Sequence, residues 1–206
     1  MKKRFKYFIT ILLTVVMVFS FPFSTSAFTR KDVTKVYKKS ITKMLKNFDS
    51  YLGYACCNGH YFRYDEYART TMTAMTNYKL NGHSITYVKK KIKPEMKLYF
   101  NTTKMTFKKS SKYQLPQNPS YLVFNKNNKI IYIEGNWGEA SPTGNVRKIV
   151  KTGLKTYEVT YNINLYNSWD KINCGLMGTY KIKLKKANNR NGFIITDMKQ
   201  TVNNKI

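Results

Sequence analysis

The segment TYEVTYNINLY, residues 156–166, constrains the fold more than any other part of the chain. Large apolar residues alternate strictly with polar ones, and this period of two predicts a β-strand with one buried and one wet face. The apolar positions are Tyr157, Val159, Tyr161, Ile163 and Leu165. Such a half-wet strand is typical of an antiparallel sheet, because parallel sheets are covered on both faces. The chain must therefore supply neighbouring strands and a layer that covers the apolar face.

Three hairpins are predicted after residue 97. They comprise residues 121–135 about an asparagine-rich turn, residues 145–166 with a turn near Thr152 and Gly153, and residues 178–201 with a turn at 188–192. The first arm of the third hairpin places Tyr180, Ile182 and Leu184 on one face and Lys181, Lys183 and Lys185 on the other. We expect about six antiparallel strands with a lysine-bearing wet face.

The connection GNWGEASPTGN, residues 135–145, separates the first two hairpins. Its Ser141–Gly144 segment matches a type I turn, with proline second and glycine fourth. Trp137 is not needed for a connection. It is expected either to cap the end of the sheet or to stand out as a contact residue.

Helical periodicity precedes the strands. Residues 28–48 carry an apolar stripe at spacings of three and four, which predicts an amphipathic helix. Residues 49–63 are interpreted as a loop. A second helix is expected over 64–82, where Asp65 and Glu66 favour the start because they meet the positive end of the helix dipole. A third, short helix is expected to begin at Ser84 and to stop near Lys93, before Pro94, with extended chain from Lys97 onward.

Helices followed by hairpins predict one α+β domain, residues 28–206, with N-terminal helices packed on a curved antiparallel sheet. This arrangement resembles the cystatin-like and NTF2-like folds. Residues 130–163 and 177–201 also resemble the C-terminal part of uncharacterised secreted proteins of Gram-positive bacteria. NTF2-like proteins include enzymes, binding modules and immunity proteins, so the resemblance implies no particular activity.

The N-terminus has the pattern of a secretory signal peptide. Basic residues at positions 2–6 precede an uncharged apolar run, and small residues stand at Thr25 and Ala27. We expect cleavage after Ala27 and a secreted or cell-surface protein; the alternative is a retained membrane anchor. Export makes a disulfide permissible, and Cys57 with Cys174 is the candidate pair, although all cysteines could instead be free and buried.

The chain is strongly basic. Its 37 Lys and Arg residues against 10 Asp and Glu give a formal net charge of +27, and loss of the four cations of the signal peptide leaves +23. Such a surface attracts polyanions over a screening length of about 8 Å. For an exported protein these are envelope polymers and anionic lipid surfaces. No nucleic-acid ligand is expected, because no binding motif accompanies the charge.

Few residues are suited to catalysis. Adjacent Cys56 and Cys57 fit zinc geometry poorly, so no metal or other cofactor is expected. A nucleophile formed by Cys57 with His60 lacks any known local motif. Glu134 and Glu139 flank Trp137, a weak match to glycoside chemistry. No catalytic residue is assigned.

Two classes of function follow. The first is a non-enzymatic secreted binding domain that contacts anionic envelope polymers or a membrane surface. Its candidate binding residues are Trp137, Glu139, Lys181, Lys183 and Lys185. The alternative is an enzyme with a pocket in the concave sheet face, lined by Trp137, Glu139, His60 or His83. An immunity or inhibitor protein is a further alternative.

Overall fold

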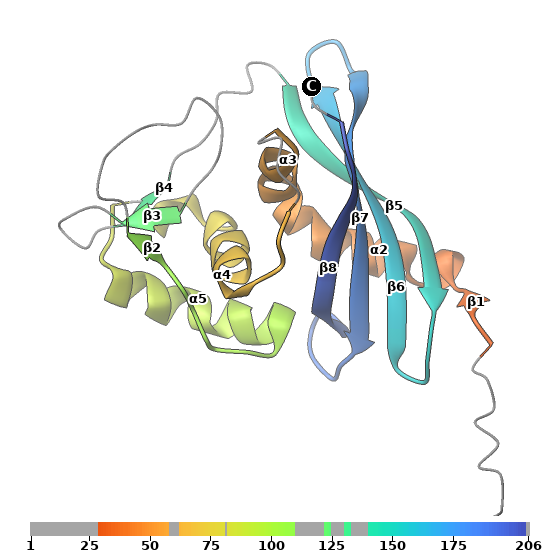
Figure 1. Cartoon of the computed structure of the whole chain (residues 1–206), viewed down its shortest axis with the longest axis horizontal. Helices are drawn as coiled ribbons and strands as arrows, with labels where there is room; N and C mark the ends of the chain where they lie inside the picture. The colour runs from red at the N-terminus through yellow and green to blue at the C-terminus, as the bar shows by residue number, and fades with distance from the viewer. Residues whose placement is uncertain are drawn as a thin grey trace, which may run out of the picture.

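The computed structural model describes residues 29–57, 62–80, 82–109, 122–124, 130–132 and 140–204, and the predicted signal peptide lies outside them. In chain order the elements are β1 (Lys31–Asp32), α2 (Thr34–Leu45), the 3-10 helix η1 (Lys46–Phe48), α3 (Asp49–Cys57), α4 (Glu66–Met75), the 3-10 helix η2 (Tyr78–Leu80), α5 (Ile85–Phe100), β2 (Lys108–Lys109), β3 (Leu122–Phe124), β4 (Ile130–Tyr132), β5 (Ala140–Lys151), β6 (Thr156–Asn167), β7 (Ile172–Lys186) and β8 (Phe193–Asn203). Helices therefore precede a run of long strands, which is the predicted α+β pattern (Figure 1). No helix in these described ranges is both long enough and apolar enough to cross a membrane.

The main sheet is open and has the strand order β1-β5-β6-β7-β8, with every neighbouring pair antiparallel. The second and third predicted hairpins are confirmed as β5–β6 and β7–β8. The first is confirmed as the antiparallel pair β3–β4, but it belongs to a separate three-stranded sheet, where β2 runs parallel to β3. The expectation of one sheet of about six antiparallel strands is therefore not confirmed.

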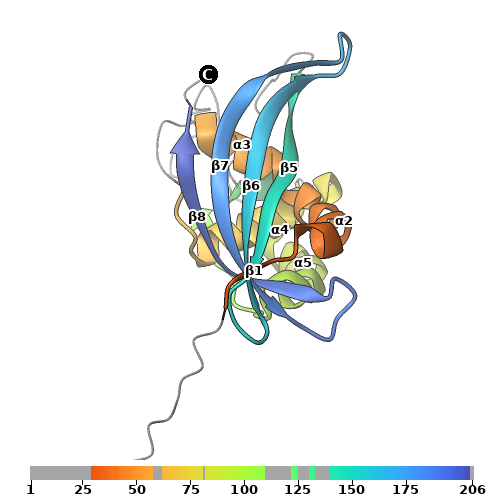
Figure 2. The same cartoon turned by 90° about the vertical axis from the view of Figure 1, so that its right-hand side faces the viewer.

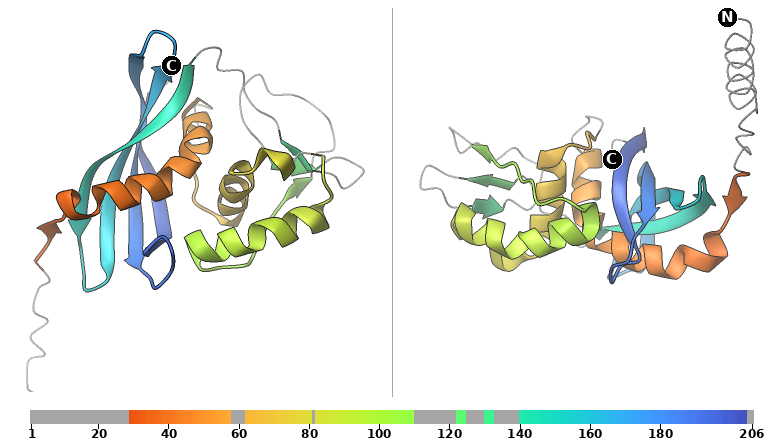
Figure 3. Two further views of the ribbon diagram at one scale, coloured as in Figure 1. Left: turned by 180° about the vertical axis from the view of Figure 1, so that it is seen from behind. Right: turned by 90° about the horizontal axis from the view of Figure 1, so that it is seen from below.

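The apolar face of the main sheet forms the core with α2. In Figure 3, α2 crosses the strands on one side of the sheet, so the sheet has one covered and one open face. Alternate residues of β6 are buried as the sequence predicts, and the predicted stripe of α2 contributes Ile41 and Met44. Tyr37 of the same stripe lies edge-on to Tyr157 and Phe193, each at 5.4 Å between ring centroids. Such pairs add to the stability gained from area burial alone.

A second unit of helices lies beside the sheet. Figure 1 shows α4 and α5 next to the β8 edge, with the small sheet beyond them. The predicted start of α4 is confirmed, because the Asp65 side chain accepts a hydrogen bond from the backbone N–H of Ala68 at 2.8 Å. The side chain thereby satisfies one of the N–H groups that the first turn of a helix leaves unpaired.

The loop predicted over residues 49–63 is wrong for residues 49–57, which form α3. The prediction relied on Gly53 as a helix breaker. In the structure Gly53 instead allows a close approach, because a Cβ at this position would collide with the Pro142 ring of β5. Packing of the helix against the strand therefore outweighs the low helix propensity of glycine, about 1 kcal/mol.

The predicted end of the third helix near Lys93 is also wrong, since α5 continues to Phe100. Pro94 and Lys90 are both exposed, and the Lys90 carbonyl lacks its helical partner because proline has no backbone N–H. Met96, Tyr99 and Phe100 are buried beyond the proline. Their burial stabilises the last turns, and Asn101 ends the helix in the left-handed conformation with φ 52°.

The type I turn predicted at Ser141–Gly144 is likewise wrong. These residues belong to β5 and pair with β6, with Ser141 opposite Tyr166 and Gly144 opposite Ile163. A strand accepts proline where one side of its backbone is unpaired. This condition is met because β1 pairs with β5 only at Val150 and Lys151.

Candidate functional site

The open face of the main sheet carries the predicted lysines of β7. Lys181, Lys183 and Lys185 alternate with buried residues, as expected. Two of these lysines have anionic partners, however. Lys183 Nζ lies 2.8 Å from Asp197 Oδ2, and Lys181 Nζ lies 3.6 Å from Glu158 Oε1. Among the described residues Lys185 has no such partner, so it is the lysine of this row whose charge is available.

Glu158 and Asp197 neutralise part of the charge on this face, although Lys199 lies opposite Lys181 and Lys148 opposite Thr160. Glu158 Oε1 also forms an ion pair with Arg30 Nη2 at 3.2 Å. The Lys181 ammonium donates to Thr160 Oγ1 at 2.9 Å. The hydrogen bond to Asp197 raises the pKa of Lys183. These exposed pairs add little stability. They reduce the charge that Lys181 and Lys183 can offer to an external anion.

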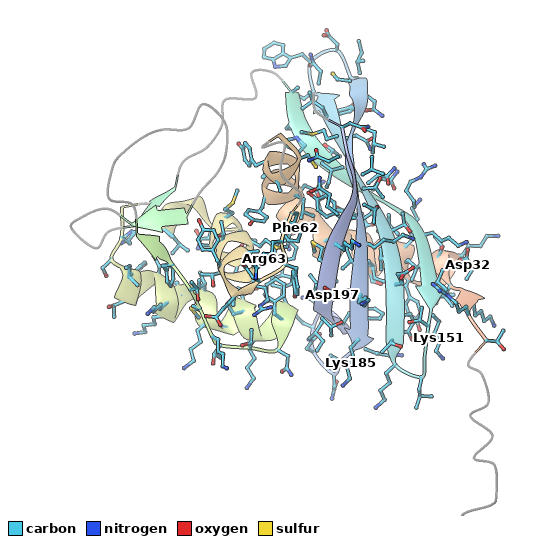
Figure 4. The ribbon with its side chains drawn as sticks, in the orientation of Figure 1. Asp32, Phe62, Arg63, Lys151, Lys185 and Asp197 are labelled. Carbon is cyan, nitrogen blue, oxygen red and sulfur yellow. The ribbon has the colours of Figure 1, made fainter. Side chains whose placement is uncertain are left out.

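A hollow of about 620 Å³ lies where Lys185 meets α5, between that helix and the β7–β8 turn. Its lining combines three cations with apolar and amide groups: Lys97, Lys185, Lys186, Pro94, Leu98, Ala187, Ile194, Asn101, Asn188 and Asn189. No carboxylate is among the described residues that line it. Figure 4 shows Lys185 at the lower end of the sheet, below Asp197.

Two contacts hold the turn against α5. The Asn189 side-chain amide donates to the Leu98 carbonyl at 3.1 Å and to the Phe193 carbonyl at 3.4 Å. The Arg190 guanidinium binds both oxygens of Glu95, at 2.7 and 3.0 Å. The walls of the hollow therefore have a fixed separation. Glu95 is the acidic residue of α5, and its charge is already matched by Arg190.

Two neighbouring hollows repeat the same chemistry. One, of about 430 Å³, is lined by Lys89, Lys90, Lys93, Thr103 and Met105. The other, of about 460 Å³, is lined by Ser40, Lys43, Met44, Asn47, Tyr99, Arg190 and Asn191. Neither has a carboxylate among its described lining residues. We call the cations of the three hollows the basic end: Lys43, Lys89, Lys90, Lys93, Lys97, Lys185, Lys186 and Arg190.

Several residues singled out from the sequence lie outside the described ranges. They are His60, Glu134, Trp137 and Glu139. Their predicted roles stay predictions. His83 is described and exposed, and it stacks on Tyr87 with 4.3 Å between the ring centroids. No group of three or more metal-ligating side chains occurs within the part of the chain that the structure covers.

The cysteines differ in environment. Cys174 is a free, exposed thiol near the β6–β7 turn, whereas the side chain of Cys57 lies outside the described residues, so their pairing stays a prediction. Cys56 is buried between α3 and the sheet. Its sulfur accepts from Gln200 Nε2 at 3.3 Å and lies 3.3 Å from the Tyr180 hydroxyl, which donates to the Leu52 carbonyl at 2.7 Å. This network fixes α3 to the sheet.

Asp49 is a buried carboxylate that the sequence did not reveal. Its oxygens accept from the Tyr161 hydroxyl at 2.5 Å and from the Gly144 N–H at 2.8 Å. Burial raises its pKa from 3.8 to about 6, although both hydrogen bonds and nearby Lys46 act in the opposite direction. Burial and Asp49 likewise raise the pKa of Tyr161. Sequence reasoning missed the pair because it placed Asp49 in a loop and Tyr161 in a purely apolar row.

No protein family, curated protein or solved structure matches this chain. Functional inference therefore depends on the described surface. The inner face of the main sheet is filled by side chains such as Tyr161, Ile163, Tyr180 and Ile182, all buried. The hollows that a ligand can enter lie outside this core, and three of them form the basic end.

Proposed function

We propose that this protein is a secreted, non-enzymatic binding domain whose basic end holds anionic polymers of the cell envelope. The observation that carries the proposal is the basic end itself: three hollows are lined by seven lysines and by Arg190, which is paired with Glu95, and no carboxylate is among their described lining residues. The predicted signal peptide supplies the setting, because export after cleavage at Ala27 would bring the domain to the envelope.

The position of the cations favours a polymer over a small anion. The cations of the basic end lie in three hollows around α5 and the β7–β8 turn. A chain of repeated negative groups can occupy several hollows at once, and each added contact then becomes intramolecular. Lysine binds phosphate as a point charge and places few geometric demands on it. The apolar lining formed by Pro94, Leu98 and Ile194 suits the carbon backbone between the charged groups.

The α+β architecture is compatible with a cystatin-like or NTF2-like domain, and that likeness is part of the proposal. It does not by itself select binding over catalysis. An enzyme with a pocket in the concave sheet face gains no support from the filled inner face. The pairing of Lys181 with Glu158 and of Lys183 with Asp197 also shifts the proposed contact to Lys185 and its neighbours.

A charge-reversal experiment tests the proposal. The triple variant Lys97→Glu, Lys185→Glu, Lys186→Glu changes the hollow between α5 and the β7–β8 turn. Binding to isolated cell walls and to purified anionic wall polymer is measured by co-sedimentation over a range of salt concentrations. At about 1 kcal/mol for each lysine near an anionic surface, we expect at least about 100-fold weaker binding and a shallower salt dependence.

The matched control reverses the same number of charges elsewhere. Lys35, Lys39 and Lys199 are exposed on α2 and β8, outside the three hollows. Their triple replacement by glutamate should leave most of the affinity in place. Equal losses in both triple variants would mean that only the total charge matters. Retention that does not change with salt in the parent protein would also contradict the proposal. Zwitterionic and anionic lipid vesicles are assayed in parallel to separate polymer from membrane binding.

A further inference from the structure

The β6–β7 hairpin extends past β8 at the end of the sheet opposite the β7–β8 turn. Pairing of β7 with β8 begins only at Gly178, opposite Asn203, and pairing of β5 with β6 reaches Asn167 opposite Ala140. The turn after Asn167 and the first residues of β7 therefore overhang β8. Figure 2 shows this hairpin curving away from the body of the domain. We call residues 167–172 the tip.

The tip presents two large apolar side chains to solvent. Trp169 is 76% exposed and Ile172 is 56% exposed. Tryptophan side chains are usually mostly buried, so an indole this exposed to water is unusual. The two residues belong to the same short turn, which distinguishes them from the isolated exposed Val36 and Leu154.

The tip is also ordered by its own hydrogen bonds. Asn167 Oδ1 accepts from the backbone N–H of Trp169 at 2.9 Å and of Asp170 at 3.3 Å. The Asn167 side-chain amide donates to Asp170 Oδ2 at 3.2 Å, and Lys171 closes the turn with φ 56°. The indole is thus held outward by a preorganised turn. The carboxylate of Asp170 is engaged at the same time, which lowers the cost of bringing the tip to an apolar surface.

We propose that the tip inserts Trp169 and Ile172 into the interfacial region of a lipid bilayer. A tryptophan side chain buries about 150–250 Å², whereas a stable protein interface needs about 800 Å² on each partner. The tip is therefore too small for a stable protein contact but sufficient for a membrane anchor. Indole prefers the boundary between head groups and acyl chains, where its ring is in apolar surroundings and its N–H remains wet. Lys171 lies beside it to meet a lipid phosphate.

The inference is independent of the proposed function. The tip and the basic end lie at opposite ends of the main sheet, and contact through the tip is apolar instead of ionic. Binding through the tip is therefore resistant to salt, and binding through the basic end is sensitive to it. A domain anchored by its tip would direct the basic end away from the membrane, toward polymers of the surrounding envelope.

The test uses the mature chain, predicted to begin at Phe28, with Trp137→Phe so that Trp169 is the remaining indole. Its fluorescence is titrated with phosphatidylcholine vesicles and with vesicles containing phosphatidylglycerol, at low and high salt. We expect a blue shift and quenching by lipids brominated near the head group, both retained at high salt. In the parent chain, Trp169→Ala and Ile172→Ala together should weaken vesicle binding at high salt by about tenfold or more.

Leu154→Ala is the matched control, because Leu154 is 79% exposed at the turn between β5 and β6, at the opposite end of the sheet. It should leave vesicle binding unchanged. Trp169 emission that does not respond to vesicles would overturn the inference, as would equal losses in the tip variant and Leu154→Ala. A Trp169 blue shift that follows protein concentration without lipid would assign the tip to a protein contact instead. Loss of polymer binding by the basic-end variant leaves the tip result unaffected, so the two proposals fail separately.

Discussion

Replacing Asp49 with asparagine tests whether a buried charge makes the stability of this fold depend on pH. The carboxylate lies between α3 and the sheet, where Tyr161 and Gly144 donate to its two oxygens. Asparagine has nearly the same shape but does not titrate. Its single carbonyl oxygen can accept from Tyr161 or from Gly144 but not replace both carboxylate oxygens; if it accepts from Gly144, its NH₂ group donates to the Tyr161 oxygen and the Tyr161 proton loses its acceptor. In either orientation one buried donor is unpaired, which costs about 1–3 kcal/mol at every pH.

The sign of the pH effect follows from the raised pKa. Because the Asp49 pKa rises from 3.8 to about 6 on folding, the native state holds a proton that the unfolded state has released between these values. The stabilising contribution of Asp49 is therefore full below the unfolded pKa and is lost as pH rises through the folded pKa. A shift of this size corresponds to about 3 kcal/mol, most of it lost between pH 4 and pH 7.

Urea unfolding of both proteins at pH 4 and at pH 7, at constant ionic strength, measures the effect. We expect Asp49→Asn to be clearly less stable than the parent at pH 4 and within about 1–2 kcal/mol of it at pH 7, where the parent carries the cost of the buried charge. Asp170→Asn at the exposed tip controls for the loss of one negative charge. A stability difference that is equal at the two pH values, or larger at pH 7, would refute the reasoning.

Two further substitutions test local features of the fold. Gly53→Ala should destabilise the protein by about 1–3 kcal/mol despite the better helix propensity of alanine, because its Cβ collides with Pro142, and adding Pro142→Ala should recover part of the loss in thermal unfolding. Asp65→Ala should cost about 1 kcal/mol and speed hydrogen exchange at Ala68, which loses its capping bond; unchanged exchange there would contradict the assigned cap.

The features that were predictable are those encoded by local period. Alternation identified β6 and the first arm of the β7–β8 hairpin, and the apolar stripe identified α2. Asp65 and Glu66 marked the start of α4, and this signal is also local. The free N–H groups of the first helical turn bond to side chains that lie within one turn in the sequence. In these segments the tertiary structure reinforces what each short stretch already favours.

The wrong predictions share a cause, which is the use of glycine and proline as local stop signals. Gly53, Pro94 and Pro142 each lie inside a regular element. In each case the tertiary structure decides the outcome: α3 packs on β5, the end of α5 is buried, and near Pro142 one edge of β5 has no partner strand among the described residues. None of these conditions can be read from the residues that flank the glycine or proline.

The candidate site was predictable only in part, and the reason is electrostatic. The lysine row of β7 was visible in the alternation, but its neutralisation depends on Glu158 and Asp197, which strand pairing brings opposite it. Only Lys185, at the end of the row, remains available. Lys97 and Lys186 line the same hollow as Lys185 because the β7–β8 turn is bonded to α5. The two segments in contact are about 90 residues apart in the sequence.

This arrangement explains how a very basic domain can discriminate among anions. If all the lysines were evenly exposed, binding would depend on total charge and fall uniformly with salt. Here Glu158 and Asp197 neutralise Lys181 and Lys183 on the open face, whereas Lys97, Lys185 and Lys186 lie together beside apolar groups at one end of the sheet. Returning a carboxylate to that end, as Lys185→Glu does, should therefore weaken polymer binding more than Lys199→Glu on β8, although the two variants have the same net charge.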